Sequence, residues 1–240
     1  MKKTKEKGNW PADSNRFVCY MDIMGFKDFV ARTEYKEVYK QMKSITYSKK
    51  DIDKTISMLY DNDTLFITRF SDSVILFSRD DSKDSLDAIS YAAASIFSDA
   101  AKNNIPMKGA LAAGKIIVDR LQNIYFGQPF IDSFLLQENE VHYYGVICHN
   151  SMEKYIESNK DNSIWIGQLY EEIKTPLKSG IIRHYNLNWF VLLTSGINAH
   201  EKREKVFNEI IKNFKFKTSG KPRKYIDNTE FVFKQFYPIV

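Results

Sequence analysis

Two short apolar runs that meet at an aspartate constrain the fold of this chain most strongly. Residues 64–70 (TLFITRF) and 73–78 (SVILFS) are rich in β-branched and aromatic residues, and only Ser71 and Asp72 separate them. This pattern predicts two antiparallel strands joined by a tight turn, with Asp72 at its tip. Further elements must pack against the hairpin, because an isolated two-stranded hairpin is only marginally stable in water.

Strand and helix signals alternate on both sides of this hairpin. Before it, residues 16–23 (RFVCYMDI) indicate a strand that runs into Asp22, and residues 27–43 indicate an amphipathic helix. After it, the alanine-rich residues 85–102 indicate the strongest helix of the chain, and residues 107–119 indicate a strand with many small side chains. The order is that of the ferredoxin-like βαββαβ pattern. We therefore predict an α+β fold, with an antiparallel sheet covered by helices.

Weaker signals predict further elements outside this core pattern. Residues 49–63 are polar and charged, so we expect a variable connection with a short helix there. A helix over 130–139 and a strand over 141–149 are appended to the core pattern. The C-terminal part then predicts an α/β extension, with a short helix over 151–157, a strand pair over 181–185 and 189–194, a helix over 199–214 and an aromatic tail.

Length and composition suit one domain with additional segments at its ends. With 240 residues, of which 43% are hydrophobic and 27% charged, the chain can form a sizeable core. We expect a flexible tail over residues 1–15, a core over 16–150, and a C-terminal extension over 151–240 that packs on the core. Cys19 and Cys148 each lie in an apolar stretch, which predicts free core cysteines of a reducing compartment.

The charge and hydropathy of the chain indicate which classes of partner it can bind. The formal net charge of +5 comes partly from lysines at positions 2, 3, 5 and 7 and from residues 215–224. Such runs are typical of solvated tails, so we expect no nucleic acid partner, although the positive charge also suits a triphosphate. No apolar run is long enough to span a bilayer, and no apolar segment follows the N-terminal lysines. We therefore expect a cytoplasmic protein with no membrane partner.

Asp22 and Asp72 form the most informative pair of polar residues. In the ferredoxin-like order the first strand lies beside the hairpin, so the two carboxylates can converge at one end of the sheet. Two carboxylates suit a hard divalent cation that keeps positions open for substrate phosphates. Two such cations can lower the pKa of a sugar hydroxyl and neutralise a diphosphate leaving group. The alternative interpretation is that Asp22 caps the following helix and Asp72 is an ordinary turn residue.

Four motifs in this order resemble the class III nucleotide cyclases. They are MDIMGF, FSDSVILF, KGALAAG, and YFGQPF followed by a helix, and the resemblance covers about residues 16–150. The resemblance implies that this segment is the catalytic core, in which Asp22 and Asp72 hold two divalent cations, Mn2+ or Mg2+. The backbone carbonyl of Ile23 would be a further metal ligand.

The same resemblance implies how a nucleoside triphosphate would bind. Met24, Gly25 and Phe26 would lie under its phosphates, with their N–H groups at a helix N-terminus. A glycine at position 25 would let the backbone approach the phosphates closely. The resemblance also implies a homodimer with composite sites, in which the helix over 130–139 reaches the substrate of the partner subunit.

The chain departs from the family pattern at the positions that serve catalysis and base choice. Ile131 and Leu135 occupy the positions where the family has an asparagine and an arginine that stabilise the transition state. Thr68 and Ile124 occupy the positions of a lysine and an aspartate that select adenine. These departures disfavour a purine cyclase of the ordinary kind.

Arg69 and Lys108 are the candidate cations that remain near the aspartate motifs. Arg69 lies on the strand before the hairpin tip, and Lys108 begins the small-residue strand. Either side chain could bind phosphate or replace the lost arginine if it faces the cleft. The alternative is that both are surface residues at strand ends. His142 and His149 lack partners at metal-ligand spacing and are expected in the core or at an edge.

The segment 127–149 also resembles the pyrimidine cyclases of bacterial Pycsar antiphage systems. The resemblance rests on its Gly-Pro turn, on an aromatic-containing helix that ends in Leu136-Gln137-Glu138, and on a tail with Lys224-Tyr225 followed by aromatics. It implies conversion of UTP to 3′,5′-cyclic UMP, a second messenger of antiviral defence that acts on a separate effector. Cytidylate cyclase, purine nucleotide cyclase and a catalytically inactive nucleotide-binding module stay open as alternatives.

Overall fold

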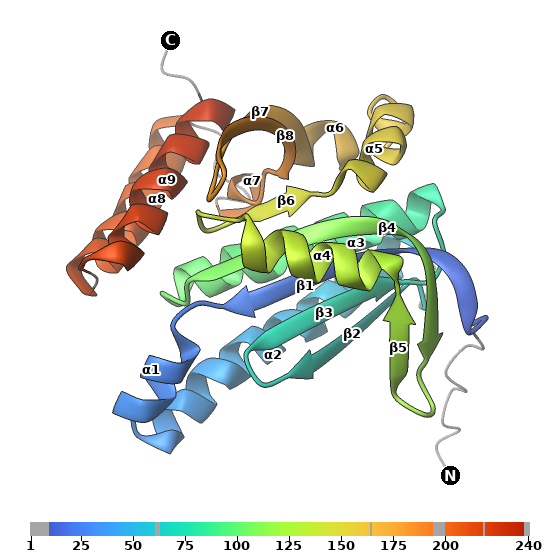
Figure 1. Cartoon of the computed structure of the whole chain (residues 1–240), viewed down its shortest axis with the longest axis horizontal. Helices are drawn as coiled ribbons and strands as arrows, with labels where there is room; N and C mark the ends of the chain where they lie inside the picture. Colours follow the sequence, from blue (N-terminus) through green and yellow to red (C-terminus); the bar gives the residue numbers. More distant parts are fainter. Residues whose placement is uncertain (1–9, 61–62, 164, 194–199, 218, 238–240) are drawn as a thin grey trace.

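A computed structural model describes the chain apart from residues 1–9, 61–62, 164, 194–199, 218 and 238–240. Within the described residues, eight strands form one sheet (Figure 1). The strands are β1 (Asp13–Ile23), β2 (Leu65–Phe70), β3 (Ser73–Ser78), β4 (Met107–Asp119), β5 (Ile124–Gly127), β6 (Val146–Cys148), β7 (Tyr170–Leu177) and β8 (Gly180–Leu187). Their order is β2-β3-β1-β4-β6-β8-β7, and β5 pairs with β4 outside this path.

The first four strands form the predicted ferredoxin-like sheet. Strand β1 lies between β3 and β4 and runs antiparallel to both, and β2 pairs with β3 through the two-residue turn at Ser71 and Asp72. The one parallel pairing among these described strands joins β4 to β6. The predicted α+β fold with a mostly antiparallel sheet is confirmed.

The helices cover both faces of this sheet (Figure 1). Helix α3 packs behind β1 and β3 with α2 against it, whereas α4 lies across β1 and β4 on the opposite face. The helical elements are α1 (Phe26–Arg32), α2 (Tyr35–Leu59), α3 (Lys83–Lys102), α4 (Gln128–Asn139), η1 (Asn150–Met152), α5 (Glu153–Asn159), α6 (Ile166–Leu169), α7 (Phe190–Leu193), α8 (His200–Lys217) and α9 (Lys221–Phe236).

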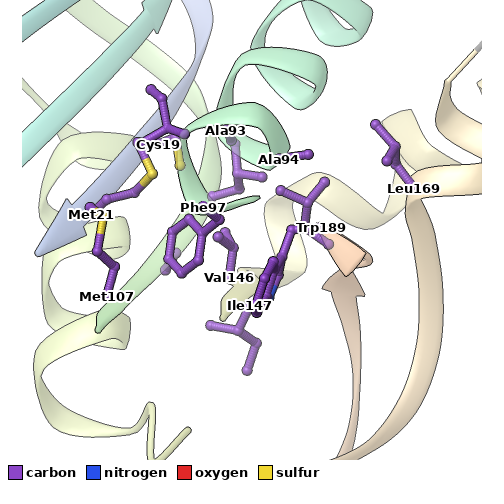
Figure 2. Close-up of a cluster of buried hydrophobic side chains, with 14 of the residues drawn as sticks. Cys19, Met21, Ala93, Ala94, Phe97, Met107, Val146, Ile147, Leu169 and Trp189 are labelled. Carbon is purple, nitrogen blue, oxygen red and sulfur yellow. The ribbon is translucent and has the colours of Figure 1, made fainter. Parts of the chain in front are cut away.

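Alternation along β1 divides the core into two parts. Cys19 and Met21 point into the large core with α3, where Phe97 and Met107 join them (Figure 2). Val18 lies in a smaller cluster on the α4 face, and Tyr20 packs against that cluster. Successive side chains of a strand point to opposite faces, so Asp22 belongs to the α4 face. Both cysteines are buried and free, as expected.

Helix α2 differs from the expected arrangement. The helix expected over residues 27–43 is interrupted at Thr33, which has an extended backbone, and a second helix then continues to Leu59. The expected variable connection over 49–63 is therefore wrong for most of its length. Ile52 and Ile56, one turn apart and both buried, anchor the second half of this helix, which contains neither glycine nor proline.

The C-terminal elements also differ from those expected. Residues 190–193 form helix α7 rather than a strand, Thr194 lies outside the described residues, and the partner of β8 is β7. The strand expected over 141–149 shortens to β6. The aromatic tail is helix α9, with Ile226, Thr229, Phe233 and Phe236 buried at helical spacing.

The N-terminal tail is shorter than expected. Strand β1 begins at Asp13, so the last residues of the expected N-terminal tail belong to the sheet, while residues 1–9 with their lysines lie outside the described part. Across the ranges that the structure describes, none of the helices is both long and apolar enough to cross a membrane.

Candidate active site

Asp22 and Asp72 lie side by side at one end of the sheet. Asp22 is the penultimate residue of β1 and pairs across the strands with Ser73, the residue that follows Asp72. The backbone N–H of Ile23 donates to the carbonyl oxygen of Asp72 at 3.1 Å. Ser71 completes the tight turn in the left-handed region, with a φ of 55°. The strand ladder and the turn together bring the two predicted residues into one site.

The carboxylate of Asp22 lies in a half-buried, electrostatically unfavourable position. Burial, and after it the charge of Asp72, raise its pKa to about 6, although Lys108 opposes both effects. The Ser73 hydroxyl lies 3.4 Å from Asp22 Oδ1 and 2.6 Å from the Tyr20 hydroxyl. A bound cation would offset this repulsion, so the two side chains fit a divalent metal.

With two aspartates at this edge, a bound cation would keep coordination positions open for a substrate. Among the described residues, no group of three or more His, Cys, Asp or Glu side chains is placed to hold a metal ion. Asp22 and Asp72 would therefore supply few of the ligands that a hard cation needs, and the remaining positions would be open to phosphate oxygens and water.

The loop after β1 contains the glycine predicted to lie under the phosphates. Gly25 precedes α1 with a φ of 72°, a left-handed conformation that favours glycine, and a Cβ there would meet no atom within 4 Å. Its backbone angle, rather than crowding by the protein, requires glycine. The N–H of Met24 donates to the Pro106 carbonyl at 2.9 Å, so this amide is already engaged. The backbone amides of Gly25 and Phe26 lie at the N-terminal start of α1.

Lys108 reaches the same edge from β4. It is the cross-strand neighbour of Asp22, and its side chain is 8% exposed. The ammonium donates to the Gln137 carbonyl at 3.2 Å and pairs with the Glu138 carboxylate at 3.1 Å, both on α4. A buried ammonium beside the aspartate pair is suited to an anionic substrate.

Arg69 does not join this group. Its cross-strand partner Val74 belongs to the large core on the α3 face, and its guanidinium donates to the Met42 carbonyl in α2 at 3.0 Å. Thr68, one residue earlier, faces the α4 side and is half-buried opposite Ile75. Ile124 lies on β5 and is exposed. The structure brings Lys108 to the aspartates and directs Arg69 away from them.

Three site residues were missed by the sequence reasoning. Tyr20 is two residues before Asp22 on the same strand, so alternation alone places it on the same face. Its ring makes edge contacts with Phe130 and Phe134 of α4. Ser73 follows Asp72 directly in the sequence. Glu138 is the last residue of the Leu-x-Glu motif, but the sequence pattern assigned it no role. Each had a local signal, but only the packing of α4 shows that they meet.

A hollow opens next to the two aspartate-bearing loops. It has a volume of about 780 Å3, and its lining includes Phe26 and Lys27 of α1, Arg32, and Ser71 of the hairpin turn. Phe26 follows Gly25 and Ser71 precedes Asp72, so the hollow adjoins the site on its outer side. Its charged lining residues are Lys27, Arg32 and Glu34.

Solved structures with the same fold are nucleotide cyclases. A bacterial light-regulated adenylyl cyclase matches with a TM-score of 0.51 and 12% identity, over 83% of this chain and all of the other. The guanylate cyclase domain of RhGC from Catenaria anguillulae in complex with GTP matches with a TM-score of 0.52 and 12% identity, over 74% of this chain and 98% of the other. This chain has the nucleotide cyclase fold.

Another structure with the cyclase fold is the catalytic core of a rhodopsin-guanylyl cyclase with converted specificity in complex with ATPαS. It matches with a TM-score of 0.52 and 12% identity, over 73% of this chain and 96% of the other. No family model matches the chain, and no curated protein matches it in sequence. At these identities the likeness establishes the fold alone.

In this chain the cyclase fold carries an exposed apolar surface around α4 and β5. Phe126, Ile131, Phe134 and Leu135 are each between 40% and 59% exposed, and Phe70 at the hairpin is 80% exposed. Ile131, Phe134 and Leu135 lie on α4, which reaches the aspartate site through Glu138, and Phe70 lies at the hairpin, whereas Phe126 pairs with Ile117 towards the other end of β4. The apolar side chains gathered on α4 are typical of a surface that another protein covers.

Proposed function

We propose that this chain is a metal-dependent nucleotidyl cyclase that converts UTP to 3′,5′-cyclic UMP and diphosphate. The observation that carries the proposal is the pairing of Asp22 with Asp72 at one end of a cyclase-fold sheet, with Lys108 beside them. The raised pKa of Asp22, caused by burial and then by Asp72, is a further sign of a site prepared for positive charge.

In this reaction the 3′-oxygen of the ribose attacks the α-phosphorus, the bond to the diphosphate breaks, and the hydroxyl proton passes to solvent. Asp22 and Asp72 would hold two divalent cations, with the Ile23 carbonyl as a further ligand. Metal ions held by these residues would lower the pKa of the attacking hydroxyl and neutralise the leaving diphosphate. Lys108 would bind a phosphate oxygen, and the amides of Gly25 and Phe26 would face the phosphates from the start of α1.

We propose that the active form is a homodimer with composite sites. The exposed apolar residues of α4 support this, because a two-fold contact would bury them and place α4 close to the partner's site. Ile131 and Leu135, at the positions of the family's catalytic asparagine and arginine, are among these exposed residues. We propose that they contribute to the dimer interface, and that other groups stabilise the negative charge of the transition state.

Base choice is the least constrained part of the proposal. Thr68 offers a hydroxyl on the same face as Asp22, and Ile124 offers only apolar surface. The lysine and the aspartate that select adenine in the family are thus absent, and the Thr68 hydroxyl can donate to or accept from uracil. The resemblance to Pycsar cyclases adds that cyclic UMP would act as a second messenger in antiviral defence, through a separate effector.

The direct test incubates the protein with each of the four ribonucleoside triphosphates and Mn2+ and identifies cyclic products by mass spectrometry. Cyclic UMP as the main product is expected. A purine cyclic nucleotide would reject the base assignment and retain the cyclase. Absence of any cyclic product, together with measurable nucleotide binding, would instead favour the inactive module, which the apolar residues at positions 131 and 135 also suit.

A further inference from the structure

Glu138, near the C-terminal end of α4, forms an ion pair that the proposed function leaves without a role. Its Oε2 atom lies 3.1 Å from Nζ of Lys108. Its charge also adds to the raised pKa of Asp22, after burial and Asp72. Glu138 is therefore a third carboxylate at the edge of the sheet where an anionic substrate would bind.

The carboxylate of Glu138 pairs with the Lys108 ammonium. In the described part of the chain, no three acidic, histidine or cysteine side chains are grouped to hold a metal ion, so Glu138 is not grouped with Asp22 and Asp72 in this way. Its negative charge instead neutralises the Lys108 ammonium. It opposes the approach of a polyanion to Lys108.

Lys108 does not depend on Glu138 for its position. Its side chain is 8% exposed on the interior strand β4, and its ammonium also donates to the Gln137 carbonyl. The side chain of Glu138, by contrast, is 54% exposed on the last turns of a helix. The Glu138 carboxylate is therefore the partner that can turn into solvent, and phosphate oxygens that take its place would keep the buried ammonium paired.

We propose that Glu138 is a built-in competitor of the substrate triphosphate, one that occupies the Lys108 ammonium until phosphate oxygens displace it. This inference rests on the proposed function only in taking Lys108 as a phosphate-binding residue. A second cation is near the displaced carboxylate, because Nζ of Lys178 donates to the backbone carbonyl of Glu138 at 2.5 Å. Glu138 sets the affinity for triphosphate below the value that Lys108 alone would give.

The test measures binding of inorganic tripolyphosphate by calorimetry, in EDTA and at low salt. Glu138→Gln keeps the size of the side chain and removes its charge, and it is expected to bind roughly three- to tenfold more tightly than the wild type. Glu140→Gln is the matched control. This residue belongs to the same end of α4 and bonds to Ser179 instead of Lys108, so its affinity should stay near the wild-type value. Lys108→Ala should abolish most of the binding.

Higher salt should reduce the difference between wild type and Glu138→Gln, which a purely structural role would not do. Equal or weaker binding by Glu138→Gln would overturn the inference, because Glu138 would then be neutral or would position Lys108. Unchanged binding in Lys108→Ala would overturn it as well. Because the assay needs no turnover, tighter binding without cyclic product would reject the proposed function alone, and product without tighter binding would reject this inference alone.

Discussion

The N–H of Ile23 donates to the carbonyl oxygen of Asp72 at 3.1 Å, and this bond joins the end of β1 to the tip of the β2–β3 hairpin. It fixes the main chain of both aspartates in one register. The metal-binding interpretation requires the two carboxylates to be held together before any cation arrives, and a backbone bond between their loops meets that requirement.

The first prediction concerns the stability of the metal-free protein. The folded-state pKa of Asp22 is about 6 because of burial and the charge of Asp72, against an ordinary value of 3.8. The folded protein therefore binds more protons than the unfolded chain between these values, and Asp22 makes the free energy of unfolding decrease as pH rises through this window. At pH 7, Asp22→Asn should be more stable than wild type by about 1 kcal/mol, allowing for solvent screening.

Urea unfolding in EDTA at pH 7 and pH 5 measures this difference. The advantage of Asp22→Asn should shrink at pH 5, where wild-type Asp22 is mostly protonated in the folded state. An advantage that is the same at both pH values, or no advantage at pH 7, would contradict the electrostatic account of the site.

The second prediction is that divalent cations stabilise the wild type through the aspartate pair. Adding Mn2+ at pH 7 should raise the melting temperature of the wild type, because the cation binds only the folded site. Asp22→Asn and Asp72→Asn should lose most of this increase. Asp28→Asn, an exposed aspartate in the first turn of α1, should keep it. Equal increases in all four proteins would mean that the cation binds elsewhere.

The third prediction concerns assembly. Leu135→Glu places a charge in the exposed apolar surface of α4 and should convert a dimer into a monomer, with loss of cyclase activity. Ile181→Glu is the control, because Ile181 is also exposed but lies on β8, away from this surface. Light scattering after gel filtration gives the mass of each variant. A wild type that is monomeric and still forms cyclic nucleotide would contradict the composite site.

The fourth prediction concerns the choice between pyrimidines. With equimolar UTP and CTP, cyclic UMP should be the main product. Thr68→Val should lower the rate with UTP by roughly tenfold, because it removes the hydroxyl proposed to contact the base and keeps the shape of the side chain. Cyclic CMP as the main product would show the base assignment to be wrong and would leave the cyclase assignment intact.

Local patterns were sufficient to predict the central part of the fold. The hairpin at Ser71-Asp72, the strand ending near Asp22 and the alanine-rich helix each have strong signals within a few residues, and their order gives the ferredoxin-like sheet. The proximity of Asp22 and Asp72 then follows from topology. The direction of the Arg69 side chain follows from alternation, since its neighbour Val74 belongs to the large core.

Other elements depend on contacts that a single sequence does not reveal. Helix α9 contains aromatics whose burial is decided by distant partners, such as Phe207 of α8 stacking on Phe233 at a ring-centroid distance of 3.9 Å. The pairing of Glu138 with Lys108 depends on how α4 crosses β4. These relationships arise from packing between elements, so periodicity within one element cannot predict them.

The most direct test of the account compares cyclic nucleotide and diphosphate formation by the wild type, Asp22→Ala, Asp72→Ala and Asp28→Ala, with Mn2+ at pH 7.5. The account predicts equal amounts of the two products from the wild type and from Asp28→Ala. It predicts a loss of roughly a thousandfold or more in Asp22→Ala and Asp72→Ala, with unchanged circular dichroism, because metal-held charge neutralisation accounts for several kcal/mol of transition-state stabilisation. Turnover within a few-fold of the wild type in either of these two variants would contradict the metal site and the cyclase mechanism built on it.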